Sequence, residues 1–202
     1  MYFQEQAHIL PIDERINNQI LNPGIDFFMR TQKIKIDSVP NFTGVGVYAI
    51  FFDNPLNTIY GNSINNNYPI YVGKAVPSGT RQGGHGVISN QLCRRISEHR
   101  RSMHQGRIDT SNVSIRFMIM TGIAVDLIPA MESAIIRFFR PLWNSYIDGF
   151  GIHTPGAGRY NQQPSEWDTL HPGRPWLEKL TGKKRDYDTI LRKISEYKMR
   201  DT

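Results

Sequence analysis

The sequence contains very little cysteine, and this limits the kinds of protein that it can encode. Cys93 is the only cysteine among 202 residues, so an internal disulfide framework and a cysteine-rich zinc site are both excluded. No apolar run reaches the roughly eighteen residues of a transmembrane helix. The opening segment MYFQEQAHILPIDER has neither the basic start nor the apolar stretch of a signal peptide. We therefore expect a cytoplasmic protein.

Motifs of several common enzyme classes are also missing. The sequence has no G-x-S-x-G nucleophile elbow, no P-loop and no convincing dinucleotide-binding fingerprint. No two of its 6 histidines have the spacing of metal ligands on one helix. Serine hydrolases of that type, P-loop NTPases and dinucleotide-dependent enzymes are therefore disfavoured, and we expect no nucleotide cofactor.

Positive charge is in excess and is unevenly distributed. The chain has 24 Lys and Arg against 18 Asp and Glu, a net charge of +6. Arginines cluster between Arg94 and Arg107, and a second basic cluster runs from Lys179 to Arg200. A basic protein attracts anions over long distances, but solvated helix faces show the same pattern. Charge alone leaves nucleic-acid binding open.

Three apolar, β-branched or aromatic runs predict strands, over residues 45–52, 70–75 and 113–120. In the first run both alternating faces are apolar, so Tyr48 could be an ordinary core residue. Gly46 beside it leaves a place where a ligand backbone could approach. The same alternation places Lys74 on the opposite side of its strand from Tyr71, unless Gly73 breaks the regular strand.

Helical spacing of apolar residues predicts helices over 89–105, with Ser89 as the N-cap, and over 128–139. Pro129 suits a first turn. Residues 12–35 are predicted to be helical in part, interrupted at NPG, and a basic helix is expected near 184–199. The glycine-rich segment 76–88 is predicted to be a loop. The order strand, strand, helix, strand, helix predicts one small layered domain of mixed helix and sheet.

Polar residues on the two central helices are candidates for chemistry. Arg95 and His99 are four positions apart and share a helix face, although Glu98 could simply pair with Arg95. Glu132 is expected in the first turn of an apolar helix, where it could favour the helix dipole. A partly buried acid also needs a partner, and a divalent cation is one such partner. Asn144 could be a helix-end or turn residue.

Read together and in order, these segments resemble the motifs of the GIY-YIG nucleases. GVGVYAI and PIYVGKA are similar to the paired tyrosine motifs, with Val47 and Val72 as conservative departures. RISEH and then ESAIIRFFRPLWN are similar to the motifs that follow, and the core resemblance covers roughly residues 44–146. The segments PIYVGKAVPSGTRQ, RPLWNS, DGFG, HTPGAGR and HPGRPW also resemble the type II restriction endonucleases of that family that cut CCGCGG.

The resemblance implies an α+β fold. Its catalytic core would span 41–146 and contain a three-stranded antiparallel sheet flanked by helices, with loop insertions. Residues 1–40 would form an N-terminal extension. Residues 147–202 would form a C-terminal extension that packs on the core and carries DNA contacts and dimerisation. A homodimer on double-stranded DNA is expected, because a two-fold dimer reads a palindrome naturally.

The resemblance also implies roles for single residues. Arg95, Glu132 and Asn144 fall at the family's helix arginine, metal-binding glutamate and asparagine, and we expect one Mg²⁺ per active site on Glu132. We expect Tyr48 to act as the base that orients water, and Tyr71 to orient water or phosphate. Because a phenol has an ordinary pKa of about 10, Tyr48 needs a neighbour, and either His99 or Lys74 could lower its pKa.

We expect the residues that read DNA bases to lie outside this cluster. Arginine is the natural candidate for a GC-rich site, because its side chain recognises guanine edges. The candidate DNA contacts are Arg81, Arg94, Arg116, Arg159 and Arg174. Two alternatives stay open beside a restriction enzyme: a structure-specific repair nuclease of the same family, and a DNA-binding module without catalysis. The full set of candidate catalytic residues argues against the module. The lack of a separate DNA-binding domain or zinc finger argues against the repair type.

Overall fold

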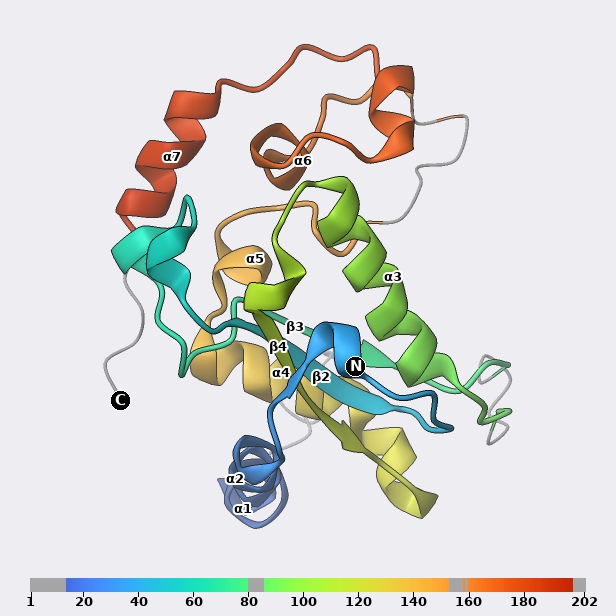
Figure 1. Ribbon diagram of the computed structural model, residues 1–202. Helices are drawn as coiled ribbons and strands as arrows, with labels where there is room; N and C mark the ends of the chain where they lie inside the picture. The colour runs from blue at the N-terminus through green and yellow to red at the C-terminus, as the bar shows by residue number, and fades with distance from the viewer. Residues whose placement is uncertain (1–13, 80–85, 153–157, 159, 198–202) are drawn as a thin grey trace, which may run out of the picture.

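An antiparallel sheet forms the centre of the molecule (Figure 1). The computed structural model describes residues 14–79, 86–152, 158 and 160–197. The strands are β1 (Ile34–Lys35), β2 (Gly46–Phe52), β3 (Tyr71–Ala75) and β4 (Val113–Ile119), in the order β1-β4-β2-β3. The three predicted strands are confirmed to within one residue at each end. The predicted count of three strands is wrong, because β1 adds a fourth.

The extra strand is too short to have a pattern of its own. β1 has only 2 residues, which pair with Ile115 and Ser114 of β4. A period-two alternation needs about four residues to be recognised. β1 is therefore defined by its hydrogen bonds to β4 and not by its own sequence.

The helices include two long ones and several short pieces. They are α1 (Glu14–Ile16), α2 (Asn22–Arg30), α3 (Gln91–Gln105), α4 (Ile128–Phe139), α5 (Leu142–Ser145), α6 (Glu166–Leu170) and α7 (Tyr187–Ser195). The bounds of α4 are confirmed. The N-cap of α3 is Asn90 and not Ser89. The backbone amide of Ser89 instead donates to Oε1 of Gln91.

The expected break at NPG is a change of helix type and not an interruption. A short π-helix, Asn17–Leu21, leads directly into α2. Pro23 lies in the first turn of α2, where its fixed φ suits a helical backbone. The helical segment therefore continues through the proline.

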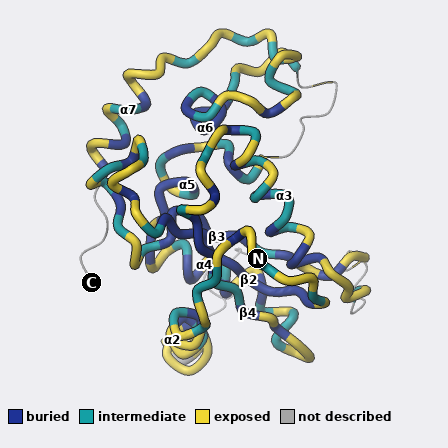
Figure 2. Tube along the Cα trace, viewed as in Figure 1, coloured by how far each residue is buried: buried dark blue, intermediate teal, exposed yellow. Residues whose placement is uncertain are grey.

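Two apolar cores lie on opposite faces of the sheet, and Figure 2 shows the central strands as the most buried part of the chain. Tyr48, Ile50 and Phe52 of β2 pack on the face covered by α3. Val47, Ala49 and Phe51 pack on the other face, against α4 and α2. Every residue of β2 is buried, and both faces of the strand are apolar. Helix α3 packs on one face and helix α4 packs on the other.

The C-terminal segment returns over the α3 face (Figure 1). Trp167 and Leu170 of α6 and Ile190 and Ile194 of α7 belong to the same apolar core as Tyr48. The segment is therefore continuous with the core that supports the tyrosines.

Candidate active site

Tyr48 and Tyr71 lie on the same face of the sheet. Tyr48 pairs with Gly73, Ile50 pairs with Tyr71, and the register stays regular from Tyr71 to Ala75. Gly73 therefore does not break the strand, and the alternation puts Lys74 on the opposite face. The two tyrosine rings are tilted, with centroids 6.3 Å apart.

Two glycines of these strands make room for close contacts. A Cβ on Gly73 would lie 2.4 Å from the Tyr48 hydroxyl, so the phenol crosses the strand in the space that the glycine leaves. Sequence reasoning missed this role, although the glycine directly after the YV pair was a visible signal. A Cβ on Gly46, which has φ +152°, would lie 2.0 Å from the Met118 carbonyl oxygen. Gly46 thus admits the neighbouring strand and not a ligand, contrary to expectation.

His99 joins the tyrosines from α3. Its Nε2 lies 2.6 Å from the Tyr48 hydroxyl, and His99 is 1% exposed. The imidazole also packs against the Tyr71 ring at 5.1 Å between centroids. Arg95, one turn earlier on α3, lies close enough to Tyr48 to act on the pKa of its phenol and forms an ion pair with Glu98 at 3.2 Å. The pairing of Arg95 with Glu98 and its approach to Tyr48 therefore coexist.

Burial determines the protonation of both phenols. It raises the pKa of Tyr48 well above its ordinary value, and the neighbouring Tyr71 adds to this rise. Arg95 acts in the opposite direction on the pKa of Tyr48 but does not outweigh burial. Burial also raises the pKa of Tyr71, with the Glu132 carboxylate adding to the rise. Both phenols therefore keep their protons at neutral pH, and no neighbour lowers the Tyr48 pKa below its ordinary value.

Glu132 approaches the same strand from the other face. It is the fifth residue of α4, in the second turn and not the first, so a favourable contact with the helix dipole does not account for it. Its carboxylate forms an ion pair with Lys74 of β3. Since β3 is an edge strand, side chains from both faces meet beside it, and the charge of Glu132 acts on both phenols.

Asn144 is bound to the open edge of β3. Its Oδ1 accepts from the Val72 amide at 2.8 Å, and its Nδ2 donates to the Val72 carbonyl at 2.9 Å. The amide of Trp143 also donates to the Ile70 carbonyl, at 2.9 Å. Asn144 therefore replaces a missing neighbouring strand and holds β3 in place, with Tyr71 next to the residue that it binds.

A cavity of about 350 Å³ opens beside this cluster, between the end of β3 and the start of α3. Its lining residues are Ala75, Val76, Gln91, Arg94, Arg95 and Glu98. The Arg94 side chain is 69% exposed at the cavity. An anion entering here meets two guanidinium groups, one at the surface and one beside the phenols.

The remaining candidate DNA contacts are distributed differently. Arg81 and Arg159 lie outside the described residues. Arg116 faces α2, where its Nη1 donates to the carbonyls of Met29 and Thr31 near the end of that helix. Arg174 is 1% exposed and bound to Asp168. The guanidinium of Arg174 is therefore used inside the C-terminal segment, and a DNA contact by Arg174 stays an untested prediction that its burial does not favour.

Two further residues contact the cluster and were missed. The Phe150 ring stacks on His99, with centroids 4.6 Å apart and planes 21° apart. A Cβ on Gly151 would lie 2.7 Å from the Tyr71 hydroxyl. Both lie in the segment DGFG, whose sequence indicates a family resemblance and no role in the site.

Comparison with models of protein families shows which family the chain belongs to. The model of the Eco29kI GIY-YIG domain matches residues 40–198. The chain belongs to the Eco29kI GIY-YIG family. This is a family of restriction endonucleases, so the chain is a nuclease of restriction type that acts on DNA. A comparison with curated proteins gives no match.

The range matched by the Eco29kI GIY-YIG family includes the paired tyrosines, Arg95, Glu132 and Asn144. The match includes α6 and α7, so the C-terminal segment belongs to the same family unit as the sheet. Within the described residues, no helix is long and apolar enough to cross a membrane. The described part of the chain also contains no group of three or more His, Cys, Asp or Glu side chains suited to a metal ion.

Proposed function

We propose that the protein is a type II restriction endonuclease that makes Mg²⁺-dependent double-strand cuts at a short GC-rich palindrome, with CCGCGG as the best candidate. The observation that carries the proposal is the 2.6 Å contact between the Tyr48 hydroxyl and His99, beside Arg95 at the end of an edge strand. This arrangement joins a proton acceptor to a group that can bind phosphate.

Tyr48 and His99 act as a proton relay. A phenol with a raised pKa cannot remove a proton from water and keep its own. The water proton therefore passes to the Tyr48 oxygen while the phenol proton passes to Nε2 of His99. The water oxygen forms the new bond to phosphorus, the bond to the leaving 3′-oxygen breaks, and that oxygen takes a proton from a second water to give the 3′-hydroxyl. Lys74 takes no part in this relay, because its ammonium lies with Glu132. Tyr71 orients the water or the phosphate.

Arg95 binds the phosphate that is cut. Guanidinium stays charged at all relevant pH values and donates two parallel hydrogen bonds to phosphate oxygens. Its contact with the Tyr48 side chain brings the phosphate close to the attacking water. Exposed Arg94 would meet the neighbouring backbone, where it adds affinity without sequence preference.

Glu132 would hold the cation. A single carboxylate fits Mg²⁺, which keeps several waters and takes substrate phosphate oxygens instead of occupying an all-protein cage. When bound, the ion would neutralise charge on the phosphoryl oxygens and assist the leaving group. Lys74 would then exchange its contact with Glu132 for the nearby phosphate.

A palindromic site implies a symmetric assembly. One active site of this kind cuts one strand, so a double-strand cut needs two chains related by a two-fold axis. The homodimer is part of the proposal, and sedimentation of the protein with one duplex tests it. Two chains per duplex are expected.

Plasmid cleavage tests the activity. Purified protein is incubated with a plasmid that carries CCGCGG, and with a matched plasmid in which that site is altered, in Mg²⁺ and then in Ca²⁺. Discrete fragments with identical ends, only from the first plasmid and only in Mg²⁺, are expected. Discrete cutting at another sequence would replace the proposed site. Cutting only of branched or damaged DNA would indicate a repair-type nuclease, and binding without cutting would indicate a non-catalytic module.

A further inference from the structure

The segment that follows α5 packs directly on the proposed relay. Phe150 is 1% exposed, stacks on His99 and meets the Tyr71 ring edge-on at 4.8 Å. Gly151 leaves room for the Tyr71 hydroxyl. A ring stacked on the imidazole limits its rotation and keeps water from the contact between His99 and Tyr48. The position of residues 149–152 therefore influences the geometry of the relay.

Arg174 holds this segment through its backbone. Its Nη2 donates to the Gly149 carbonyl at 3.0 Å, and its Nη1 donates to the carbonyls of Ile152 at 3.1 Å and Phe150 at 3.4 Å. Its Nε donates to Asp168 at 2.5 Å, so the buried charge is paired. Only the guanidinium fork, with its several donors in one plane, can bind an acid and three carbonyls at once.

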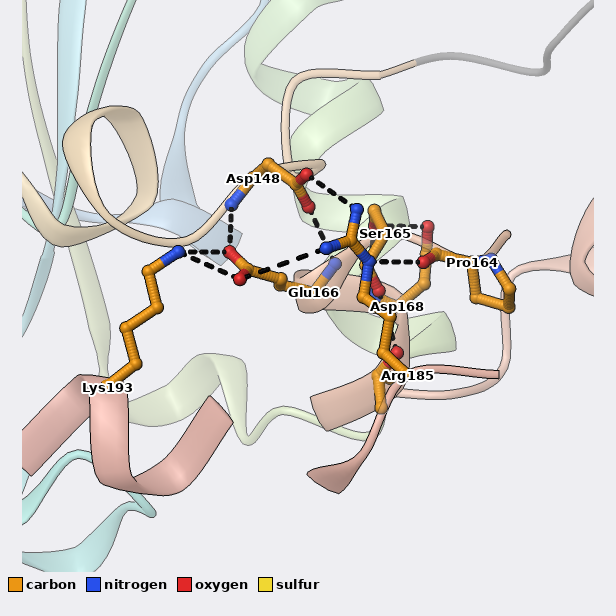
Figure 3. Close-up of polar contacts among 8 residues, drawn as sticks. Asp148, Pro164, Ser165, Glu166, Asp168, Arg185 and Lys193 are labelled. Atoms are coloured by element: carbon orange, nitrogen blue, oxygen red, sulfur yellow. Dashed lines mark hydrogen bonds and ion pairs between the residues drawn. The ribbon is translucent and has the colours of Figure 1, made fainter. Parts of the chain in front are cut away.

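Aromatic rings and α6 keep Arg174 and Asp168 in place. The guanidinium carbon of Arg174 lies 4.6 Å from the centroid of Trp167 and 4.5 Å from that of Trp176. Ser165 donates to the second oxygen of Asp168 at 2.7 Å (Figure 3). Because Trp167 and Asp168 both belong to α6, this short helix is the support for the segment.

A second set of contacts binds the start of the same segment to α6. The Glu166 amide donates to Asp148 at 2.6 Å, and the Asp148 amide donates to Glu166 at 3.1 Å (Figure 3). Lys193 of α7 pairs with Glu166 at 2.8 Å, and Arg185 pairs with Asp148 at 3.2 Å. The backbone of residues 148–152 is therefore held at both ends by the C-terminal part of the chain.

We propose that Arg174 is a positioning residue for DNA cleavage. By binding the carbonyls of residues 149–152 it holds Phe150 against His99 and Gly151 beneath the Tyr71 hydroxyl, so turnover depends on a C-terminal residue that touches neither DNA nor the reacting atoms. This inference rests on the proposed nuclease mechanism and deepens it.

Kinetics of four variants test the proposal. Phe150→Leu keeps an apolar side chain but loses the stacked ring, and Arg174→Met loses the donors. Both are expected to lower kcat about tenfold or more, since small displacements of reacting groups have effects of that size. The KM for DNA should change little. Arg174→Lys keeps the charge beside Asp168 but not the fork, so it should restore the thermal stability lost in Arg174→Met while turnover stays low. Gly158→Ala is the control, because no atom of the described residues lies within 4 Å of a Cβ at that position.

The NMR signal of the His99 ring gives a readout that does not need cleavage. Its Cε1 proton should be shifted by the ring current of Phe150, and the shift should be lost in Phe150→Leu and in Arg174→Met but not in Gly158→Ala. Assignment follows from the signal that disappears in His99→Gln. Unchanged kcat in Phe150→Leu, or an unchanged kcat and an unchanged His99 signal in Arg174→Met, would overturn the inference. A wild-type protein that cuts no DNA, but shows the shift and its loss, would overturn the nuclease mechanism and leave the positioning of His99 supported.

Discussion

The Tyr48 hydroxyl lies 2.6 Å from Nε2 of His99, and the same distance separates the Tyr60 hydroxyl from Nε2 of His171. Both phenols are buried, and burial raises the pKa of each. The pairs differ in their surroundings. Arg95 approaches Tyr48, whereas the Trp143 indole donates to Tyr60 at 2.9 Å. One chain therefore contains a proposed relay and a structural pair with nearly the same local geometry.

Tyr48→Phe is expected to lower the cleavage rate about a hundredfold or more, because general acid–base catalysis commonly contributes that much. Tyr60→Phe is the matched control. Each substitution removes the buried hydrogen bonds of one hydroxyl, which for Tyr60 are those with His171 and Trp143. Each should lower the free energy of unfolding by about 1–3 kcal/mol, but only the first should affect turnover. Plasmid cleavage and denaturant unfolding measure the two effects. Equal cleavage rates in the two variants would remove the Tyr48 phenol from the mechanism.

Glu132→Gln should abolish Mg²⁺-dependent cleavage, with a loss of at least about a hundredfold, because a group preorganised against developing charge contributes on that scale. The shape of the side chain is kept, so DNA binding measured without metal should remain. Glu178→Gln, an exposed acid on another surface, should cut normally. Normal Mg²⁺-dependent cleavage by Glu132→Gln would show that the cation is held elsewhere.

Asn144→Ala should slow cleavage about tenfold or more through displacement of β3. The Val72 amide should exchange its hydrogen faster, since its acceptor is lost. Asn112 provides a control, because it binds the backbone N–H and C=O of Asn54 at 2.7 and 2.9 Å in the same manner. Asn112→Ala should leave turnover unchanged. A similar loss of turnover in both variants would mean that Asn144 acts only on general stability.

Acid should destabilise the fold through His171. Burial lowers the pKa of His171 from 6.5 to about 4, so the folded protein prefers the neutral ring. The stabilisation is present above pH 6.5 and is lost as the pH falls toward 4, an effect on the order of 3 kcal/mol. Unfolding free energies of wild type and His171→Gln, compared between pH 7 and pH 4, isolate this effect. Parallel pH profiles for the two proteins would contradict it.

The predictable part of the fold is the part with strong local patterns. The strands over β2, β3 and β4 and the bounds of α4 follow from runs of β-branched residues, from helical spacing and from the prolines that flank a helix. β1 has no such pattern, since its hydrogen bonds to β4 define it. Arg174 shows that the contacts of a single side chain also cannot be predicted from a local sequence pattern. In sequence, a basic residue among Gly and Pro is typical of a DNA contact, and only the path of the chain shows that Asp168 and three carbonyls surround it.

By itself, the sequence determined the order of the motifs, and with it the family, the candidate residues and the alternation of side chains within each strand. These depend on residue identity and on the period of a strand, which are local properties. The register between β2 and β3, which puts Tyr48 and Tyr71 on one face, came from the structure. The tertiary structure alone decided which neighbour each residue has. His99 and not Lys74 lies against Tyr48, Asn144 binds the edge of β3, and Phe150 covers the imidazole. These contacts join positions far apart in the chain, and they exist because two helices and a returning C-terminal segment pack around one edge strand.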